Sequence, residues 1–451
     1  MDPSPLDLLP QTKPLPRHPN LDQYRKQAKD LVKALDTGDP VAIRFLKDYH
    51  PRFDCLSAEE VHRAEPALAD AQFTIARQYG FDSWPKFARH IEQLSRGGSS
   101  VAAFEAAADA VVAGDVAALA RLLCDSPELI RSRSNRAHRA TLLHYVSANG
   151  VEEFRRRTPP NVAAVAALLL DAGAEVDATI QRSETNLGAF AVFKGENVTR
   201  WFGVDFSPAV GSYTTLGLVA TNARLGRTIS DGLLTVLLDR GASIDGVAGG
   251  PVIVDACLAL GCRDAAELLA KRGARLDLQA AAGVGRLDRV EALLGDGSGR
   301  NDAIQRQTER GFRWACLYGR TAVVDFLLRR GVTTSSAAAG PSRAMPIPWP
   351  SIGLHEAVMG GHLETVKRLL DHQRAAPADR AHQANAWLLK FAVWRATRDA
   401  ESDGDATDRD WLGIIEALLE AGAGVEQGNG PTGNARVDDL LARFGIKKKT
   451  S

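Results

Sequence analysis

Apolar residues along most of this chain recur at helical spacing and then stop at a glycine. In LETVKRLLDH, residues 363–372, the apolar positions are three or four residues apart, at Leu363, Val366, Leu369 and Leu370. The run LLLDAGAEVD, residues 168–177, stops at Gly173, a residue type that accepts the positive φ of a helix C-cap. The pattern predicts short amphipathic helices that end at glycines.

This ending returns along the chain. Leu-Leu-x-x-Gly or a close variant occurs at 237–245, 269–277, 293–297, 327–332 and 418–426, with weaker copies at 122–126 and 369–373. A second pattern, clearest as TLLHYVSANG at 141–150 and IGLHEAVMGG at 352–361, precedes several copies. Such short helices are unstable alone and bury their apolar stripes only against neighbouring hairpins. Self-similarity at this period predicts an all-α solenoid of stacked helix pairs.

These patterns resemble the ankyrin repeat, whose signature reads T-P-L-H-x-A-A-x-x-G before an apolar helix and L-L-x-x-G-A. The matching residues are Thr141, Leu143, His144 and Gly150 in one copy and Leu354, His355, Ala357 and Gly361 in another. The signature proline is absent, and other copies replace the histidine. The resemblance covers roughly residues 101–444 and implies an ankyrin-repeat solenoid of about seven to eight degenerate repeats. It also implies that His144 and His355 hydrogen-bond backbone of the adjoining finger; an acid–base role would need a nearby carboxylate.

Two insertions fall where ankyrin repeats carry their fingers, at residues 178–213 and 333–350. The first contains Trp201, Phe202 and Tyr213, and the second ends beside Trp349. Fingers and first helices line the concave face of ankyrin arrays, so these residues are candidates for binding. Alternatively, the insertions are plain loops, because the entropy of loop closure grows slowly with length.

The N-terminal region differs from the repeats. Residues 1–19 are proline-rich, and we expect them to be disordered. The helical pattern of residues 20–95 predicts a small helical domain, with a capping box at Ser57 and Glu60 and a helix that starts at Ser83. AQFTIARQYGFDSWPKF, residues 71–87, resembles the helical leader found ahead of ankyrin arrays in a group of bacterial proteins. That group implies no particular chemistry. Residues 445–451 form a short basic tail.

Composition narrows the function classes. Basic and acidic residues balance at 55 each, which gives no global field for nucleic acid or anionic membrane. The N-terminus lacks the pattern of a secretory signal, and no apolar run reaches the ~18 residues needed to span a bilayer. The five cysteines are scattered without a CxxC pair. We therefore expect a cytoplasmic protein that binds neither nucleic acid nor membrane.

The sequence offers no catalytic signature. It contains no phosphate-binding glycine loop, no GxSxG elbow and no cluster with zinc spacing, so no cofactor and no metal site are predicted. We expect the cluster EEFRRR, residues 152–157, to form a solvated charged turn. The alternative is that its arginines clamp an anion. We expect the Trp314 side chain, next to Arg313, to pack in the core. The alternative is that it lies on a helix of the concave face.

Two functions remain open at this stage. The favoured one is a scaffold that binds a protein partner on a concave ankyrin surface. The alternative is an enzyme or small-molecule binder whose pocket is built by the 178–213 insertion, the 141–150 helix and the N-terminal domain. Whether the chain is an enzyme stays open, and the absence of a catalytic set favours a non-enzymatic role. The candidate binding residues are His144, Tyr145, Arg155, Trp201, Phe202, Tyr213, Arg313, Trp314, Trp349 and His355.

Overall fold

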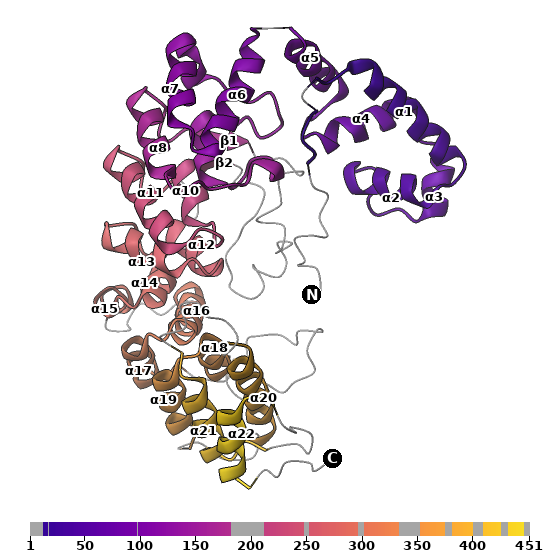
Figure 1. Ribbon diagram of the computed structural model, residues 1–451. Coiled ribbons are helices and arrows are strands. Elements are labelled where there is room, and N and C mark those ends of the chain that lie inside the picture. The colour runs from indigo at the N-terminus through magenta and orange to yellow at the C-terminus, as the bar shows by residue number, and fades with distance from the viewer. Residues whose placement is uncertain are drawn as a thin grey trace. The chain divides into compact units, whose positions relative to one another are not determined.

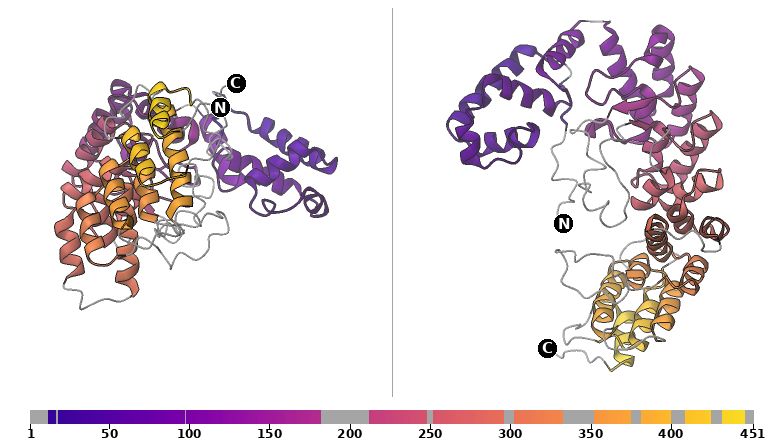
Figure 2. Two further views of the ribbon diagram at one scale, coloured as in Figure 1. Left: turned by 90° about the horizontal axis from the view of Figure 1, so that it is seen from below. Right: turned by 180° about the vertical axis from the view of Figure 1, so that it is seen from behind.

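The computed structural model describes residues 12–16, 18–96, 98–181, 212–247, 252–295, 302–332, 352–374, 381–399, 409–424 and 432–445. The chain divides into two compact units, an N-terminal unit, Met1–Ala274, and a C-terminal unit, Arg275–Ser451. The described residues are mostly helical, with one two-stranded sheet (Figures 1 and 2). The expected all-α, solenoid type of fold is confirmed.

The N-terminal unit begins with five helices: α1 (Leu21–Asp36), α2 (Pro40–Tyr49), α3 (Ala58–Arg63), α4 (Leu68–Gln78) and α5 (Trp84–Leu94). Their starts follow the capping rules read from the sequence. Ser57 accepts a hydrogen bond from the backbone of Glu60, and the Glu60 side chain accepts one from the Ser57 backbone, which completes the predicted capping box. Pro85 lies in the first turn of α5, where its missing N–H has no cost.

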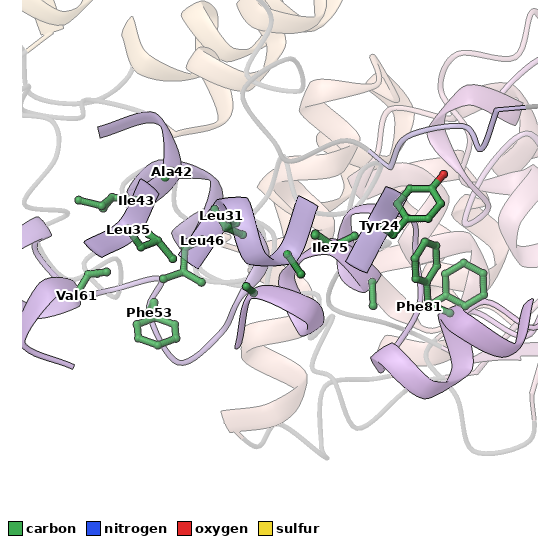
Figure 3. Packing of buried hydrophobic residues seen from close by; sticks show 14 of the residues in the cluster. Tyr24, Leu31, Leu35, Ala42, Ile43, Leu46, Phe53, Val61, Ile75 and Phe81 are labelled. Carbon is green, nitrogen blue, oxygen red and sulfur yellow. The ribbon is translucent and has the colours of Figure 1, made fainter. Parts of the chain in front are cut away.

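A continuous apolar core holds these helices together (Figure 3). It runs from Leu21 to Ile91 and includes a group of aromatic rings around Tyr24. The Tyr24 ring lies 4.9 Å from that of Phe87 and 5.3 Å from that of Tyr79, both edge-on. Such edge-to-face contacts fix the direction from which each ring packs. Residues 20–95 thus bury a core of their own within the N-terminal unit.

The rest of the N-terminal unit is built from helix pairs that pack in two layers. One layer holds α6 (Ser100–Ala113), the 3₁₀-helix η3 (Leu142–Ser147), α10 (Thr215–Ala220) and α12 (Ile253–Ala259). The other holds α7 (Val116–Asp125), α8 (Val162–Asp171), α11 (Arg227–Asp239) and α13 (Arg263–Lys271), with short 3₁₀-helices η2 (Pro127–Arg131) and η4 (Glu153–Arg155) between pairs. The helix expected at 141–150 is therefore a short 3₁₀-helix.

A small hairpin stem stands at the ends of the first insertion. Strand β1 (Thr179–Gln181) pairs antiparallel with β2 (Ser212–Thr214), so that Ile180 is opposite Tyr213. Gly173 precedes this stem with φ +93°, as its position after α8 predicted. A left-handed conformation of this kind costs a residue with a Cβ about 1 kcal/mol or more, which explains the glycine.

The C-terminal unit repeats the two-layer arrangement (Figure 1). One layer contains α14 (Leu278–Val284), α16 (Asp302–Leu317), α18 (Ile352–Gly360) and α20 (Ala381–Asp399). The other contains α15 (Leu287–Leu294), α17 (Thr321–Arg329), α19 (Leu363–Arg374) and α21 (Trp411–Glu420), and α22 (Ala435–Arg443) packs at the end. In the first layer the backbones come very close: a Cβ on Gly360 would lie 2.2 Å from the carbonyl oxygen of Leu317.

Candidate functional site

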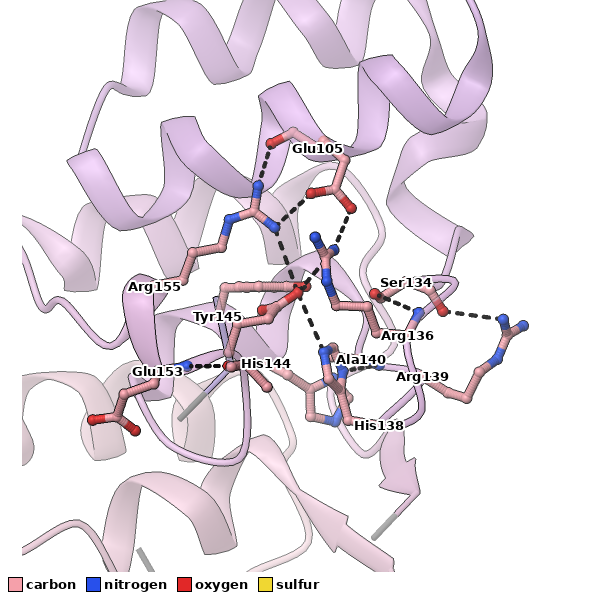
Figure 4. Close-up of polar contacts among 12 residues, drawn as sticks. Glu105, Ser134, Arg136, His138, Arg139, Ala140, His144, Tyr145, Glu153 and Arg155 are labelled. Atoms are coloured by element: carbon pink, nitrogen blue, oxygen red, sulfur yellow. Dashed lines mark hydrogen bonds and ion pairs between the residues drawn. The ribbon is translucent and has the colours of Figure 1, made fainter. Parts of the chain in front are cut away.

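Charged side chains from separate segments meet in the interior of the N-terminal unit (Figure 4). Arg136, in the loop before η3, is 2% exposed and lies between two carboxylates. Its Nη1 is 2.5 Å from Oε1 of Glu105 on α6 and 3.0 Å from Oε1 of Glu152. The Glu152 side chain, 1% exposed, also accepts a hydrogen bond of 3.1 Å from the hydroxyl of Tyr145.

Arg155 closes the other side of this buried ion cluster, which we define as Glu105, Arg136, Tyr145, Glu152 and Arg155. Its Nη1 is 2.8 Å from Oε2 of Glu105, and its Nη2 donates to the Glu105 backbone carbonyl. Its Nε donates to Asp109 at the surface, 2.8 Å away. The guanidinium carbon also lies 5.8 Å from the centre of the Tyr145 ring. Two guanidinium groups and two carboxylates, of which Glu152 is fully buried, therefore balance each other.

The pKa values of the cluster follow from this balance. Burial alone would raise the pKa of Glu105, but Arg136 and Arg155 outweigh it and lower the pKa. The pKa of Glu152 falls well below its usual range, because Arg136, His138 and Arg155 overcome the cost of burial. Burial, with Glu152 next in importance, raises the pKa of Tyr145 well above its usual value. At neutral pH both carboxylates stay ionised and the phenol stays protonated.

Two histidines adjoin the cluster. His138 is 3.4 Å from Glu152, through Nε2, while its Nδ1 accepts a hydrogen bond from the Ala140 backbone. His90, on α5, is 1% exposed, and within the described residues neither of its ring nitrogens has a hydrogen-bond partner. Burial, followed by the positive charge of Arg136, lowers the pKa of His90 to about 4. His90 is therefore a neutral ring in a charged surrounding.

The solvated charged turn favoured for residues 152–157 is wrong for Glu152 and Arg155. Glu152 is 1% exposed and Arg155 is 4% exposed, because α6 and the loop around Arg136 cover them. Their charges are paired within the protein, so the guanidinium group of Arg155 is not available as an anion clamp. The carboxylates of Glu105 and Glu152 each contact both Arg136 and Arg155. These contacts fix the relative position of α6, the Arg136 loop and η4.

His144 has the structural role that the ankyrin resemblance implied. Its Nε2 lies 2.9 Å from the carbonyl oxygen of Ala178, at the start of the first insertion, and its Nδ1 lies 2.8 Å from the Thr141 hydroxyl. The ring is fully buried, which lowers its pKa to about 3 despite the hydrogen bond to Ala178. The expected bond to finger backbone is confirmed for His144.

The alternative function, a pocket for a small molecule, would be supported if His144, Tyr145, Arg155 and Trp201 converged. The structure brings Tyr145 and Arg155 together in the buried ion cluster but directs His144 to Ala178 instead. Tyr213 pairs through its backbone with Ile180 in the hairpin stem, and its side chain is half-buried. Trp201, Phe202 and Trp349 lie outside the described residues. The described members of the set thus serve the interior of the fold.

Arg313 and Trp314 lie on α16 with different surroundings. The Trp314 side chain is 1% exposed, so the core packing favoured for it is confirmed. Arg313 donates from Nη2 and Nε to Oε1 of Glu356 on α18, at 2.7 Å and 3.2 Å. Glu356 is itself buried, and the pair links two neighbouring helices of the same layer.

His355 begins a row of aromatic side chains across α18 and α20. Its ring stacks on Trp387 at 5.4 Å between centroids, Trp387 stacks on Phe391 at 5.9 Å, and Phe391 lies 5.7 Å from Trp394. Trp394 is 47% exposed, and Met359, one turn after His355, is 38% exposed. We define these five residues as the aromatic face. Two of them, Trp394 and Met359, are exposed, and the other three are half-buried. Exposed apolar side chains of this kind are typical of a protein-binding site.

Sequence reasoning included His355 but missed the other members of the aromatic face. Trp387, Phe391 and Trp394 are separated by four and three residues, the spacing of one helical face, and this signal was present in the sequence. Glu105 and Arg136 of the buried ion cluster carried no such signal. They lie 31 residues apart and meet only through the packing of α6 on the following loop.

Among the described residues, no group of three or more His, Cys, Asp or Glu side chains is placed to hold a metal ion. No helix in the described part of the chain combines the length and apolar character that crossing a bilayer requires.

Comparison with known proteins supports the repeat assignment. A model of the ankyrin repeat family matches residues 354–382, which include most of α18 and all of α19. The chain is thus similar to ankyrin-repeat proteins over this copy. No curated protein matches the chain. Ankyrin repeats generally mediate binding to protein partners.

Proposed function

We propose that this protein is a scaffold that binds a protein partner on the concave face of its ankyrin-type helix stack. The observation that carries the proposal is the aromatic face. It lies on α18 and α20, which belong to the same layer, and α18 is the first helix of the repeat that the family model matches. First helices line the concave side of ankyrin arrays, and solenoids use such surfaces for recognition.

Energetics also favours a binding role for these side chains. An exposed tryptophan and an exposed methionine beside stacked rings keep apolar area in water that a partner would cover. Tryptophan is among the residues that contribute most to protein interfaces, and methionine adapts its shape to different partners. A fold that needed these side chains only for its core would bury them as it buries Trp314.

The proposal gives the N-terminal region a supporting role. Residues 20–95, of which residues 71–87 resemble a leader found in bacterial ankyrin proteins, are proposed to cap the end of the array. Contacts support this: α5 packs on α6, and Arg136 Cδ lies 3.4 Å from where a Cβ on Gly80 would be. End repeats of solenoids need such a cover because their apolar faces have no neighbour. The setting proposed is the bacterial cytoplasm.

The test is affinity capture with the full chain as bait, followed by quantitative mass spectrometry of the captured proteins. The bait variants are Trp394→Ala and, as matched control, Phe444→Ala, since Phe444 is an exposed aromatic residue after α22 and outside the aromatic face. A partner captured by wild type and by Phe444→Ala but lost with Trp394→Ala supports the proposal. A wild-type bait that enriches no protein over a denatured bait contradicts it.

A further inference from the structure

Residues 12–16, Thr-Lys-Pro-Leu-Pro, lie between the N-terminal helical domain of residues 20–95 and the first repeats. We define these five residues as the strap. Thr12 is 8% exposed, and its hydroxyl oxygen accepts a hydrogen bond of 3.1 Å from the backbone N–H of Glu153. Glu153 is the first residue of η4 and follows Glu152 of the buried ion cluster. One end of the strap is therefore bonded to the repeats.

The strap is also bonded to the helical domain. The backbone N–H of Lys13 donates to the carbonyl oxygen of Gln78, the last residue of α4, at 2.9 Å. The Leu15 side chain is half-buried and packs against the apolar core of this domain. The Lys13 side chain, in contrast, is exposed. Neighbouring residues of the strap thus join the end of α4 to the start of η4.

Two prolines make the strap easier to dock. The rings of Pro14 and Pro16 hold φ at about −65°, so the undocked strap samples fewer conformations than an ordinary segment. Docking then costs less conformational entropy and needs fewer contacts. Short segments held by few contacts open locally at a lower free energy than a packed core does. The strap therefore has the properties of a connection that docks and undocks.

Further contacts between the helical domain and the repeats involve α5 and the loop before it. Helix α5 packs on α6, His90 Nε2 is 3.8 Å from Oε1 of Glu105, and the Ala137 backbone donates to the Gly80 carbonyl oxygen at 2.9 Å. The chain between α5 and α6 includes Gly98, which has φ +74° and open space around its Cβ position. A glycine in such a place accepts changes of φ and ψ, so this connection can act as a hinge.

Resting on the capping role proposed for residues 20–95, we infer that the strap holds this domain closed on the first repeats and that undocking of the strap lets the domain open. The domain moves as one body about the connection between α5 and α6, because the core from Leu21 to Ile91 belongs to its own helices. Opening uncovers η4 and brings water to the buried ion cluster. The inference does not involve the aromatic face.

Variants of the strap in the full chain test this inference. Thr12→Val removes the hydroxyl that accepts from Glu153 and keeps the shape of the side chain. The double variant Thr12→Val with Leu15→Ala also weakens the contact with the domain core. The matched control is Lys13→Ala, which changes an exposed side chain of the strap and keeps the backbone bond to Gln78. Far-UV circular dichroism and thermal melts check that each variant folds.

Two measurements report the opening. Hydrogen exchange resolved to single amides follows the Ala137 N–H, whose bond to Gly80 crosses from the repeats to the helical domain. Electron paramagnetic resonance measures the distance between spin labels on Cys55, in the helical domain, and Cys124, on α7, which are both exposed. Cys262→Ser in every labelled protein removes a partly exposed thiol.

We expect the Ala137 amide to exchange about tenfold faster in Thr12→Val, and faster still in the double variant. The label distances should gain a second, broader population in the same order. The amides of α1 and α2 should keep their wild-type protection, and Lys13→Ala should match wild type in both measurements. The inference is overturned if neither strap variant changes these readouts, or if Lys13→Ala changes them equally. It is also overturned if α1 and α2 lose protection together with Ala137, since the strap would then be part of the domain core.

The wild-type distances separate this inference from the capping role on which it rests. If the labels on Cys55 and Cys124 give one narrow distance in wild type and in both strap variants, the cap stands and the strap inference fails. If the wild-type distances are already broad and the Ala137 amide is unprotected, the cap and the strap inference both fail. A narrow wild-type distance that broadens in the strap variants supports both.

Discussion

Arg136 and Glu152 form an ion pair in the interior of the N-terminal unit, with Nη1 3.0 Å from Oε1 and side chains that are 2% and 1% exposed. The two residues come from segments on either side of η3. Taking both charges out of water is costly, and the cost is offset here by additional contacts with Glu105, Arg155 and Tyr145. Such a cluster is sensitive to the removal of any one member.

Replacement of one buried carboxylate tests this sensitivity. We expect Glu152→Gln to lower the free energy of unfolding of the N-terminal unit by about 3 to 5 kcal/mol, because Arg136 then loses one of its two counter-charges. Asp109→Asn is the matched control. Asp109 contacts the same Arg155 but is 66% exposed, so its loss should cost less than about 1 kcal/mol. Urea denaturation measures both, and hydrogen exchange across residues 100–160 localises the effect. Similar losses in the two variants would contradict the buried cluster.

We expect the buried His90 to make the stability of the fold depend on pH. Its folded-state pKa is about 4, below the ~6.5 of an unfolded histidine, so the unfolded chain binds the proton first as the pH falls. The stability contributed by the neutral ring is therefore complete above pH ~6.5 and is lost toward pH ~4. Between pH 7 and 4.5 this loss amounts to about 2 to 3 kcal/mol.

The measurement is urea denaturation of wild type and His90→Leu over this pH range. The leucine variant should keep its stability at pH 7, since no hydrogen bond of His90 within the described residues is broken. Its loss of stability on acidification should be smaller than that of wild type. Parallel pH profiles would show that His90 is not the group responsible.

We expect a substitution at Gly360 to cause a steric clash, because α16 and α18 approach each other closely there. In Gly360→Ala the new Cβ would meet the carbonyl oxygen of Leu317 at 2.2 Å, so α16 and α18 must separate. We expect a cost of about 1 to 3 kcal/mol. Gly232, on α11, has open space around its Cβ position, and Gly232→Ala should instead add up to about 1 kcal/mol through helix propensity. Thermal melts of the two variants should therefore shift in opposite directions.

A pair of tryptophans distinguishes the core from the aromatic face. Trp314→Ala should destabilise the C-terminal unit by about 3 to 5 kcal/mol, because this fully buried side chain leaves a large cavity. Trp394→Ala removes a half-exposed ring and should cost about 1 kcal/mol or less. Denaturant midpoints measure the difference. A large loss of stability in Trp394→Ala would assign this ring to the core and weaken the proposed binding role.

Local rules predicted much of the fold. Four predicted features depend on residues close in sequence or on a repeated motif. They are the cap at Ser57, the helix starting at Ser83, the positive φ of Gly173 and the hydrogen bond from His144 to the finger backbone. The repeat made such signals stronger, because each copy supports the others.

Burial of the charged residues could not be predicted in the same way. A run such as EEFRRR is usually solvated, because burying a charge that has no partner costs a large amount of free energy. Glu152 and Arg155 are buried because Glu105 and Arg136 reach them from other segments, and nothing in the spacing of these residues indicates the meeting. The aromatic face was different: its helical spacing was visible, but its exposure depended on how α20 packs.

The hairpin stem of β1 and β2 has a practical consequence for protein engineering. Because the ladder sets Gln181 opposite Ser212, the chain leaves and re-enters the stack at two points about 5 Å apart. A guest domain whose own termini are adjacent could replace the residues between them without stretching the host. A fluorescent reporter joined at these two points would be anchored through Ala178 to the His144 ring, and so to the body of the array.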